Sequence, residues 1–389
     1  MHEEGDATVP REHYLDNSAT TQVWPEVGDL VREVLVERYG NPSSLHSKGL
    51  EAELLMKAAA ADLARILNCA PEELYFTSGG TEANNWAILS GYESRRRRAT
   101  GVITTAFEHS SVLEPVQYLA ERQGAQAVFV TPDSEGHIRP ADVLEQVDEN
   151  TALVSLMAVN NEIGTVLPIQ ALTAAIKKKA PKALVHCDGV QAFGKLPINL
   201  KAWGVDLFTF TGHKIHAPKG VGALYIKKGV HLPPLVRGGK QQRGLRPGTE
   251  NVAYAAALAL AAKRCARDRA RNMERVTALR DRLLAWAAAD GGVQINSPQD
   301  ALPYIVNLSV PGFRSETLLH FLAERGVYVS SGSACAKGGP SHVLASIGLS
   351  GPRGDSALRV SMDAGNTEED IDALCAGIEA ARQSLVGRK

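Results

Sequence analysis

Short apolar runs alternate with helix-length segments from about Tyr14 to Ile226, and this rhythm restricts the possible folds more than any other feature of the chain. Most of the runs are continuously apolar rather than alternating, which is typical of strands that are covered on both faces. The pattern predicts an α/β domain with a largely parallel sheet flanked by helices. The expected strands are Leu74–Thr77, Val102–Thr105, Ala127–Val130, Ala152–Val159, Ala183–Cys187, Asp206–Phe210 and Val221–Ile226, and helices are expected at Gly80–Arg97, Ser110–Gln123 and Ile169–Ala180.

The pattern changes after a Gly- and Arg-rich stretch, Arg237–Gly248, where a smaller α+β domain is expected to begin. We place a large domain at residues 14–255 and a small domain at residues 256–389, and we assign residues 1–13 to the small domain as well. The elements expected beyond the stretch are a long helix from about Asn251 to Ala289, a strand Tyr304–Leu308, a helix Ser315–Arg325, short strands near Val327–Val329 and Leu358–Ser361, and a last helix from about Thr367.

Charge and composition argue against several classes of partner. The formal net charge is -1, so neither nucleic acid nor an anionic membrane is an expected direct partner. The basic run Arg95–Arg98 fits a solvated helix end, and the apolar stretch Val252–Ala262 is too short to cross a bilayer. Residues 1–11 carry no recognisable targeting signal. Five widely spaced cysteines without a CxxC pair predict neither disulfides nor a metal site, and they fit a reducing cytoplasm.

Three expected strand ends carry groups that could serve chemistry together. Thr77 to Asn84 forms a Gly-rich turn before a helix, in which Gly80 and Thr81 could hold a phosphate. Asp188 ends a second strand and Lys214 follows a third. Each feature has an ordinary alternative: a well-formed helix start, an acid that caps the next helix, and a solvated loop lysine. Ligands of open α/β sheets bind outside the carboxyl ends of the strands, which favours a shared site.

Taken in chain order, these segments resemble fold-type I enzymes that use pyridoxal 5'-phosphate (PLP), within the class V aminotransferase superfamily. The similarity is greatest to cysteine desulfurases of the NifS/IscS type, and it extends over nearly the whole chain. The segments that carry it are Tyr14–Thr21, Gly40–Ser44, Ser78–Glu82, Glu108–His109, Asn160–Thr165, Asp188–Gln191, Thr211–Lys214, Arg246–Asn251, Ser330–Cys335 and Leu358–Arg359.

The resemblance implies a role for each matching residue. Lys214 would carry the cofactor and move the substrate Cα proton, Asp188 would pair with the pyridine nitrogen, and Gln191 would donate to the ring oxygen. His109 would stack on the ring and assist proton transfer, although it could also simply cap the helix that begins at Ser110. The phosphate contacts implied are Gly80, Thr81, Thr211, His213 and, from the neighbouring subunit of a homodimer, Thr249. The substrate contacts implied are Asn160, Arg359 and, at the entrance, Asn41.

Cys335 is the implied acceptor of sulfur from L-cysteine, and it lies in a segment of small residues with Lys337 two positions on. The products would be L-alanine and a persulfide on Cys335, for delivery to an acceptor protein such as an iron–sulfur scaffold or a tRNA-thiolating enzyme. The other four cysteines, Cys69, Cys187, Cys265 and Cys375, fit small buried apolar residues.

Two departures from the family pattern and three alternative functions remain at this point. The chain between Cys335 and Ser341 is about two residues shorter than in well-known members, which implies a shorter reach. Gly189 stands where alanine is more usual, and we expect little consequence. The alternatives are a selenocysteine lyase, another class V aminotransferase, and a non-catalytic partner-binding protein on the same fold.

Overall fold

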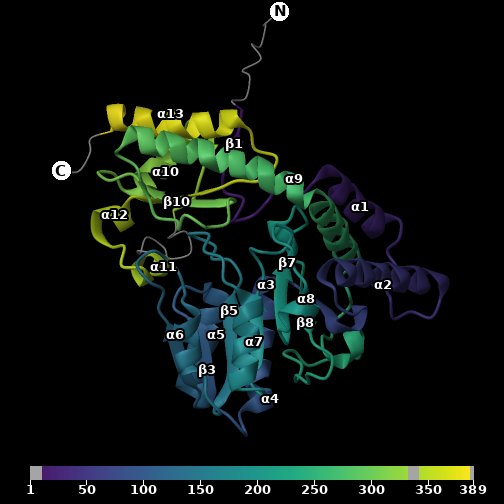
Figure 1. Cartoon of the computed structure of the whole chain (residues 1–389). Helices are drawn as coiled ribbons and strands as arrows, with labels where there is room; N and C mark the ends of the chain where they lie inside the picture. The colour runs from purple at the N-terminus through teal and green to yellow at the C-terminus, as the bar shows by residue number, and fades with distance from the viewer. Residues whose placement is uncertain (1–10, 332–340, 386–389) are drawn as a thin grey trace, which may run out of the picture. The chain divides into compact units, whose positions relative to one another are not determined.

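The computed structural model describes residues 11–331 and 341–385, and by their contacts these residues form two compact units (Figure 1). The first, here called the sheet unit, comprises Thr20–Asn161 and Thr165–Arg271. The second, the C-terminal unit, falls within Met1–Ala19, Glu162–Gly164 and Asn272–Lys389. Helix α9 (Val252–Asp290) contributes residues to both. The domain bounds given from the sequence stay a prediction.

The sheet unit is built on seven strands in the order β2-β8-β7-β6-β5-β3-β4, and only β8 runs antiparallel to its neighbours. Every residue of β2, β5, β6, β7 and β8 is buried, as continuously apolar strands require. The predicted mixed, mostly parallel sheet is confirmed. The strands are β2 (Leu74–Thr77), β3 (Gly101–Thr105), β4 (Gln126–Val130), β5 (Thr151–Met157), β6 (Leu184–Asp188), β7 (Leu207–Thr211) and β8 (Gly222–Ile226).

Helices follow most of these strands, and Figure 1 shows them beside the sheet. The expected helix from Gly80 is continuous but contains a π-helical turn, Trp86–Ser90, between α3 (Gly80–Asn85) and α4 (Gly91–Arg95). At its end the Arg95 Nε donates to the Lys182 carbonyl, which agrees with a helix-end role for the basic run. The other helices of the unit, besides the start of α9, are α1 (Pro25–Val36), α2 (Ser47–Leu67), α5 (Ser110–Gln123), α6 (Pro140–Gln146), α7 (Ile169–Lys179) and α8 (Leu200–Trp203).

The C-terminal unit contains a three-stranded antiparallel sheet with β10 in the middle, and a parallel pair of β1 and β11. This agrees with the predicted α+β architecture. Its strands are β1 (His13–Tyr14), β9 (Gln294–Ile295), β10 (Ile305–Ser309), β11 (Val327–Tyr328) and β12 (Ala357–Ser361), and its helices besides α9 are α10 (Ser315–Ala323), α11 (His342–Ser346), α12 (Gly351–Asp355) and α13 (Glu368–Ser384).

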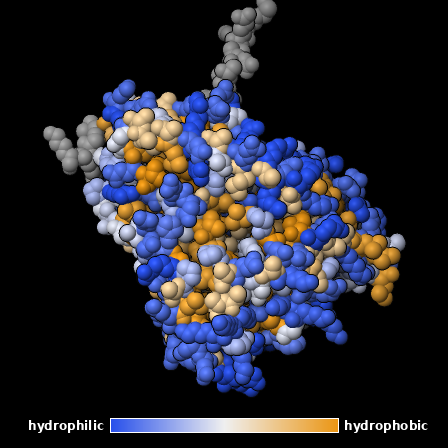
Figure 2. Space-filling view, viewed as in Figure 1, coloured by the Kyte–Doolittle hydropathy of each residue, from blue (hydrophilic) through white to orange (hydrophobic). Residues whose placement is uncertain are grey.

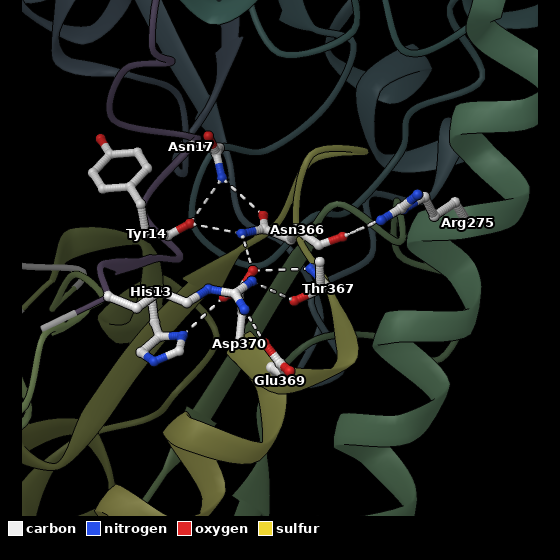
Figure 3. Close-up of polar contacts among 9 residues, drawn as sticks. His13, Tyr14, Asn17, Arg275, Asn366, Thr367, Glu369 and Asp370 are labelled. Carbon is white, nitrogen blue, oxygen red and sulfur yellow. Dashed lines mark hydrogen bonds and ion pairs between the residues drawn. The ribbon is translucent and has the colours of Figure 1, made fainter.

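The first described residues are fastened to the start of α13 by a polar cluster around Asp370 (Figure 3). The Asp370 carboxylate accepts from the Thr367 backbone N–H and the Asn366 amide, and its other oxygen lies 2.8 Å from His13 Nδ1. Asn366 in turn donates to the Tyr14 carbonyl at 3.0 Å. Burial opposes ionisation, but these hydrogen bonds still hold the pKa of Asp370 below its usual value.

Among the described residues, no helix is both long and apolar enough to traverse a bilayer.

Gly189 packs directly against Phe208, so the expectation that this departure has little consequence is wrong. A Cβ at position 189 would overlap the Phe208 ring, which is fully buried and contacts the Trp203 ring edge-on at 6.1 Å between centroids. The Phe208 ring thus occupies the space that an alanine methyl would need. The glycine and the phenylalanine form a matched pair at the end of β6 and on β7.

We predict that Gly189→Ala destabilises the protein by about 1–3 kcal/mol, because the added methyl overpacks a filled core. The double variant Gly189→Ala/Phe208→Leu should recover part of this loss, since the smaller side chain makes room for the methyl. Urea unfolding of both single variants and the double variant measures the coupling. Strictly additive effects of the two substitutions would contradict the pairing.

Candidate cofactor and substrate site

The turns after β2, β6 and β7 meet around Gly80. A Cβ on Gly80 would lie 2.9 Å from Val190 Cγ2 and 3.9 Å from Thr211 Cβ, so only a residue without a side chain fits there unaltered. The preceding Gly79 has a φ of 156°, which L side chains rarely adopt. The structure therefore brings together the three strand ends that the sequence predicted to share a site.

Asp188 lies at the carboxyl end of β6 with 4% of its surface exposed. One carboxylate oxygen accepts from the Val190 backbone N–H at 2.9 Å, and the other accepts from Asn84 Nδ2 at 2.7 Å. Burial raises the pKa of Asp188, while these hydrogen bonds and the charge of Lys214 oppose the rise. Both oxygens accept N–H groups, an arrangement that favours the ionised form. The alternative of an acid that caps the next helix is wrong, because Val190 lies in a turn and the helix that follows β6 is α8, which begins only at Leu200.

His109 caps helix α5, as the ordinary alternative proposed, through one edge of its ring. Its Nδ1 accepts from the Ser111 backbone N–H at 3.1 Å and lies 2.8 Å from Ser111 Oγ. Ser111 Oγ also accepts from Asn84 Nδ2 at 2.9 Å, so His109 and Asp188 are joined through two polar side chains. A cavity of about 580 Å³ lies beside this group and is lined in part by Thr81, His109 and Ser111.

Gln191 is oriented by a buried lysine that the sequence reasoning missed. Lys195 Nζ, four residues further along the turn, donates to Gln191 Oε1 at 2.9 Å. With its oxygen accepting from a cation, the amide nitrogen of Gln191 is the end that can donate to a ligand. The spacing of four residues was the available signal, but no pattern in the sequence predicts a helical turn at that point.

Lys214 ends a single 3-10 turn, Gly212–Lys214, directly after β7. Thr211, the last residue of β7, donates its hydroxyl to the Val221 carbonyl at 3.1 Å. Burial, reinforced by the nearby cations Lys214, Lys219 and Lys195, lowers the pKa of His213 to about 3. His213 is therefore a neutral imidazole at physiological pH and can donate one N–H to a phosphate.

Glu108 is fully buried beside the same strand ends and was quoted in the sequence motif without a role. Its Oε1 accepts from the Thr105 hydroxyl at 2.7 Å and from the Met157 backbone N–H at 2.8 Å. The Glu108 carboxyl group thereby links the ends of β3 and β5, since it accepts hydrogen bonds as a backbone carbonyl would. Met157 of β5 is paired with Asp188 of β6, so Glu108 lies next to the end of β6 as well. Burial raises the pKa of Glu108 to about 8, against its two hydrogen bonds and with a contribution from the charge of Asp188.

Two of the predicted substrate residues belong to the sheet unit. Asn160 lies close to Glu108, whereas the Asn41 side chain bonds within its own turn. Asn160 is fully buried and donates to the Phe107 carbonyl at 2.8 Å, one residue before Glu108. Asn41 is exposed in the turn between α1 and α2, where its side chain accepts from the Ser43 N–H at 2.9 Å. Its place at the substrate entrance stays a proposal.

The segment Arg246–Thr249, which is predicted to reach the phosphate of the neighbouring subunit, is hydrogen-bonded to the Gly-rich turn of its own chain. Arg246 forms a bidentate ion pair with Glu82, in which Nε and Nη2 donate to the two carboxylate oxygens at 2.9 and 3.1 Å. The Glu82 carboxylate also accepts from the Ser78 N–H. Burial works against ionisation, yet these bonds hold the pKa of Glu82 below its usual value. Thr249 itself is exposed.

Arg359 belongs to the C-terminal unit, on β12, where its guanidinium donates to Asp16 Oδ1 at 2.7 Å. Cys335 lies outside the described residues, but both flanks of its segment are anchored within this unit. On one side, Ser330 and Arg359 exchange backbone hydrogen bonds of 3.1 and 2.6 Å. On the other, Ser341 caps α11 and donates its hydroxyl to the buried carboxylate of Glu162.

The four remaining cysteines are free thiols, and three of them, Cys187, Cys265 and Cys375, are buried as predicted, whereas Cys69 is only partly buried. Cys187 and Cys265 are buried, and burial raises the pKa of Cys69 and Cys375 to about 12. Burial also raises the pKa of Cys187, so Cys69, Cys187 and Cys375 would not be thiolates at neutral pH.

The residues present fit PLP, by the chemistry of the donors. The side chains of Thr81 and His213 offer neutral donors for a phosphate beside a glycine turn that has no room for a Cβ, and the Thr211 hydroxyl would join them if it exchanged its bond to the Val221 carbonyl for one to the phosphate. An ionised, nearly buried Asp188 suits a pyridinium nitrogen, and Lys214 supplies the amine for covalent attachment. Within residues 11–331 and 341–385, no cluster of side chains suited to a metal ion is present.

Comparison with known proteins places the chain in a family. The model of the family described as aminotransferase class V matches residues 13–374. The chain therefore belongs to the class V aminotransferase family, whose enzymes depend on PLP.

Individual relatives are cysteine desulfurases by name. Cysteine desulfurase IscS of Clostridium botulinum is 40% identical over 365 residues, which cover 92% of this chain and 91% of the relative. A solved structure of a NifS-like protein has a TM-score of 0.91 at 38% identity and covers 96% of this chain and 100% of its own. A structure of SspA in complex with cysteine has a TM-score of 0.80 at 30% identity, with 90% and 99% covered. The likeness to NifS/IscS-type desulfurases that the motifs predicted is thus confirmed.

We predict that Glu108 makes the protein less stable as the pH rises. The folded pKa of about 8 exceeds the unfolded value of about 4.3, so the folded state holds the extra proton between these values and loses stability as the pH rises through this window. Glu108→Gln keeps an acceptor for Met157 but cannot ionise, and its stability should lack this slope. Urea unfolding at pH 5.5 and pH 8.5 measures the difference, and parallel pH profiles for the two proteins would contradict the assignment.

Proposed function

We propose that this protein is a cysteine desulfurase that converts L-cysteine to L-alanine and leaves the sulfur as a persulfide on Cys335. The observation that carries the proposal is the meeting of the Gly80 turn, Asp188 and Thr211 at one edge of the sheet, directly before Lys214. The named relatives, including one solved with cysteine, supply the substrate class.

The roles proposed for the sheet-unit residues follow their chemistry. PLP, when bound, supplies an electron sink that makes the substrate Cα–H acidic. Asp188 holds the positive charge of the ring nitrogen, and Gln191, with its oxygen engaged by Lys195, donates to the ring oxygen. Thr81, Thr211 and His213 bind the phosphate, and the amine of Lys214 carries the cofactor and then accepts and returns the Cα proton.

The C-terminal unit supplies the nucleophile and a substrate anchor in this proposal. Arg359 binds the substrate carboxylate, and its guanidinium can do so in addition to its bond with Asp16. Asn160 is the second proposed substrate contact. The Cys335 thiolate attacks the substrate sulfur, the Cβ–S bond breaks with its electron pair going to carbon, and L-alanine is released after protonation. Asn41 and Thr249 complete the proposed site, at the entrance and at the partner's phosphate.

We propose further that the persulfide passes to an acceptor protein in the cytoplasm. An iron–sulfur scaffold and a tRNA-thiolating enzyme are the acceptors that the family resemblance suggests. The segment between Cys335 and Ser341 is about two residues shorter than is usual, which limits its reach and favours an acceptor that docks closely.

We predict that intact protein incubated with L-cysteine gains the mass of one sulfur atom on Cys335, with L-alanine as product. Cys335→Ala should lower alanine formation by about two orders of magnitude or more, because the nucleophile is lost. Cys69→Ala is the matched control, because the Cys69 thiol has a pKa of about 12 and should not react. 3-Mercaptopyruvate as product, or unaltered turnover in Cys335→Ala, would point to an aminotransferase, and pyruvate released together with sulfide would point to a lyase that eliminates sulfide. Activity confined to selenocysteine would point to a selenocysteine lyase.

We also propose that the enzyme is a homodimer whose interface includes the outer face of α1 and α2. Six large hydrophobic side chains are exposed here, and Figure 2 shows hydrophobic surface at this end of the sheet unit, at the right of the view. Beneath them, α1 and α2 pack on Val252 and Ala253, which follow the Arg246–Thr249 segment closely in the chain. A second copy of the chain seated on this face would suit a segment that serves the neighbouring phosphate site. The exposed residues are Leu35, Val36, Tyr39, Leu45, Leu50 and Leu54.

We predict that wild-type protein sediments at twice the chain mass of 41.6 kDa. The double variant Leu45→Glu/Leu54→Glu should sediment as a monomer, because two buried charges without partners weaken an interface. It should also bind PLP about tenfold or more weakly, since each phosphate site lacks its partner's contribution. Tyr328→Glu, at an exposed position of the C-terminal unit, is the control. A monomeric wild type that binds PLP fully would contradict the proposal.

A further inference from the structure

We propose that Asn84 and Ser111 are positioning residues that fix the tautomer of His109 and couple it to the charge of Asp188. The effect on catalysis rests on the proposed function, but the geometry rests on four hydrogen bonds within the sheet unit. They run from Asp188 through Asn84 and Ser111 to His109, over distances of 2.7, 2.9, 2.8 and 3.1 Å.

The orientation of the Asn84 amide is set first. Asn84 is 1% exposed, and its nitrogen has two hydrogens, one for Asp188 Oδ2 and one for Ser111 Oγ. The reversed amide would place a carbonyl oxygen 2.7 Å from a carboxylate oxygen, which is repulsive. The ionised Asp188 therefore selects the amide orientation, and both amide hydrogens are used.

The direction of the Ser111 hydroxyl follows. Its oxygen accepts from Asn84, so its single hydrogen is free to point to His109 Nδ1 at 2.8 Å. The same Nδ1 accepts from the Ser111 backbone N–H, the capping bond of α5. A ring nitrogen that receives two N–H or O–H hydrogens is an acceptor and carries no proton of its own.

The neutral His109 imidazole therefore carries its proton on Nε2. The capping bond and a role in proton transfer, which the sequence offered as alternatives, are compatible because they use opposite edges of the ring. The imidazole is held by its Nδ1 edge at a helix end, and its Nε2–H edge can serve the reaction. A buried carboxylate that also faces the cofactor ring holds this arrangement in place.

The test uses perdeuterated holoenzyme labelled with ¹⁵N in histidine, with the His109 signals identified by their loss in His109→Gln. Wild-type protein should show an unprotonated Nδ1 and a protonated Nε2. Ser111→Ala removes the hydroxyl hydrogen, and the ring should then populate the other tautomer. Ser111→Thr retains a hydroxyl and should restore the wild-type signals, and Ser110→Ala, one residue away and outside the chain of bonds, should leave them unaltered.

Turnover of L-cysteine gives the second readout. Ser111→Ala should lower kcat about threefold to tenfold with KM within about twofold, because the ring is mispositioned for proton transfer while substrate binding is retained. A proton on Nδ1 in the wild type, or identical spectra and kcat for Ser111→Ala and wild type, would overturn the proposal. If the predicted tautomer is found but L-cysteine yields no alanine, the proposed function is wrong and the positioning role of Asn84 and Ser111 still holds.

Discussion

The candidate site depends on one buried negative charge, the carboxylate of Asp188 at the end of a central strand. An ion in the protein interior needs compensating donors, and here two N–H groups satisfy its two oxygens. The neighbouring Glu108 takes the opposite form, because burial and the charge of Asp188 raise its pKa to about 8. Burial raises the pKa of both carboxyl groups, and the two N–H groups that donate to Asp188 favour its ionised form. Asp188 is therefore suited to hold a cationic ring, and Glu108 joins the strands.

The sequence predicted the sheet unit well because its strands are buried on both faces and are therefore continuously apolar. All seven expected strands are present, with ends shifted by no more than two residues. The meeting of Gly80, Asp188 and Thr211 could also be foreseen, since parallel strands bring their carboxyl ends to one edge. The π-helical turn at Trp86–Ser90 could not be foreseen, because it does not interrupt the apolar periodicity of the sequence.

The supporting residues were missed because their partners are distant in the chain. Asn84 serves an oxygen 104 residues away, and Glu108 accepts from a strand 49 residues away. Nothing in a local pattern signals such bonds, although Glu108 stood inside a segment that carries the family resemblance and Asn84 ended the predicted Gly-rich turn. Gly189 was misjudged for the same reason, since its role is to make room for Phe208, which lies on the next strand. Residues that contact a ligand can be identified from sequence motifs. Residues that orient those ligand-binding side chains are identified only from the contacts in a structure.

The division of the chain into two units separates the proposed cofactor residues from the proposed nucleophile and Arg359. Each group is well supported in its own unit: the Asp188 network in one, and the anchored flanks of the Cys335 segment in the other. Glu162, only two residues beyond Asn160, already belongs to the C-terminal unit and holds Ser341 there. The chain thus passes from a proposed substrate contact to an anchor of the nucleophile's segment within three residues.

Borohydride reduction of the PLP-loaded protein, followed by peptide mass spectrometry, tests the central claim most directly. The account predicts a phosphopyridoxyl group fixed on Lys214, and its loss from that peptide in Lys214→Ala. A stable adduct on Lys195 instead, or no adduct on any lysine of protein saturated with PLP, would contradict it.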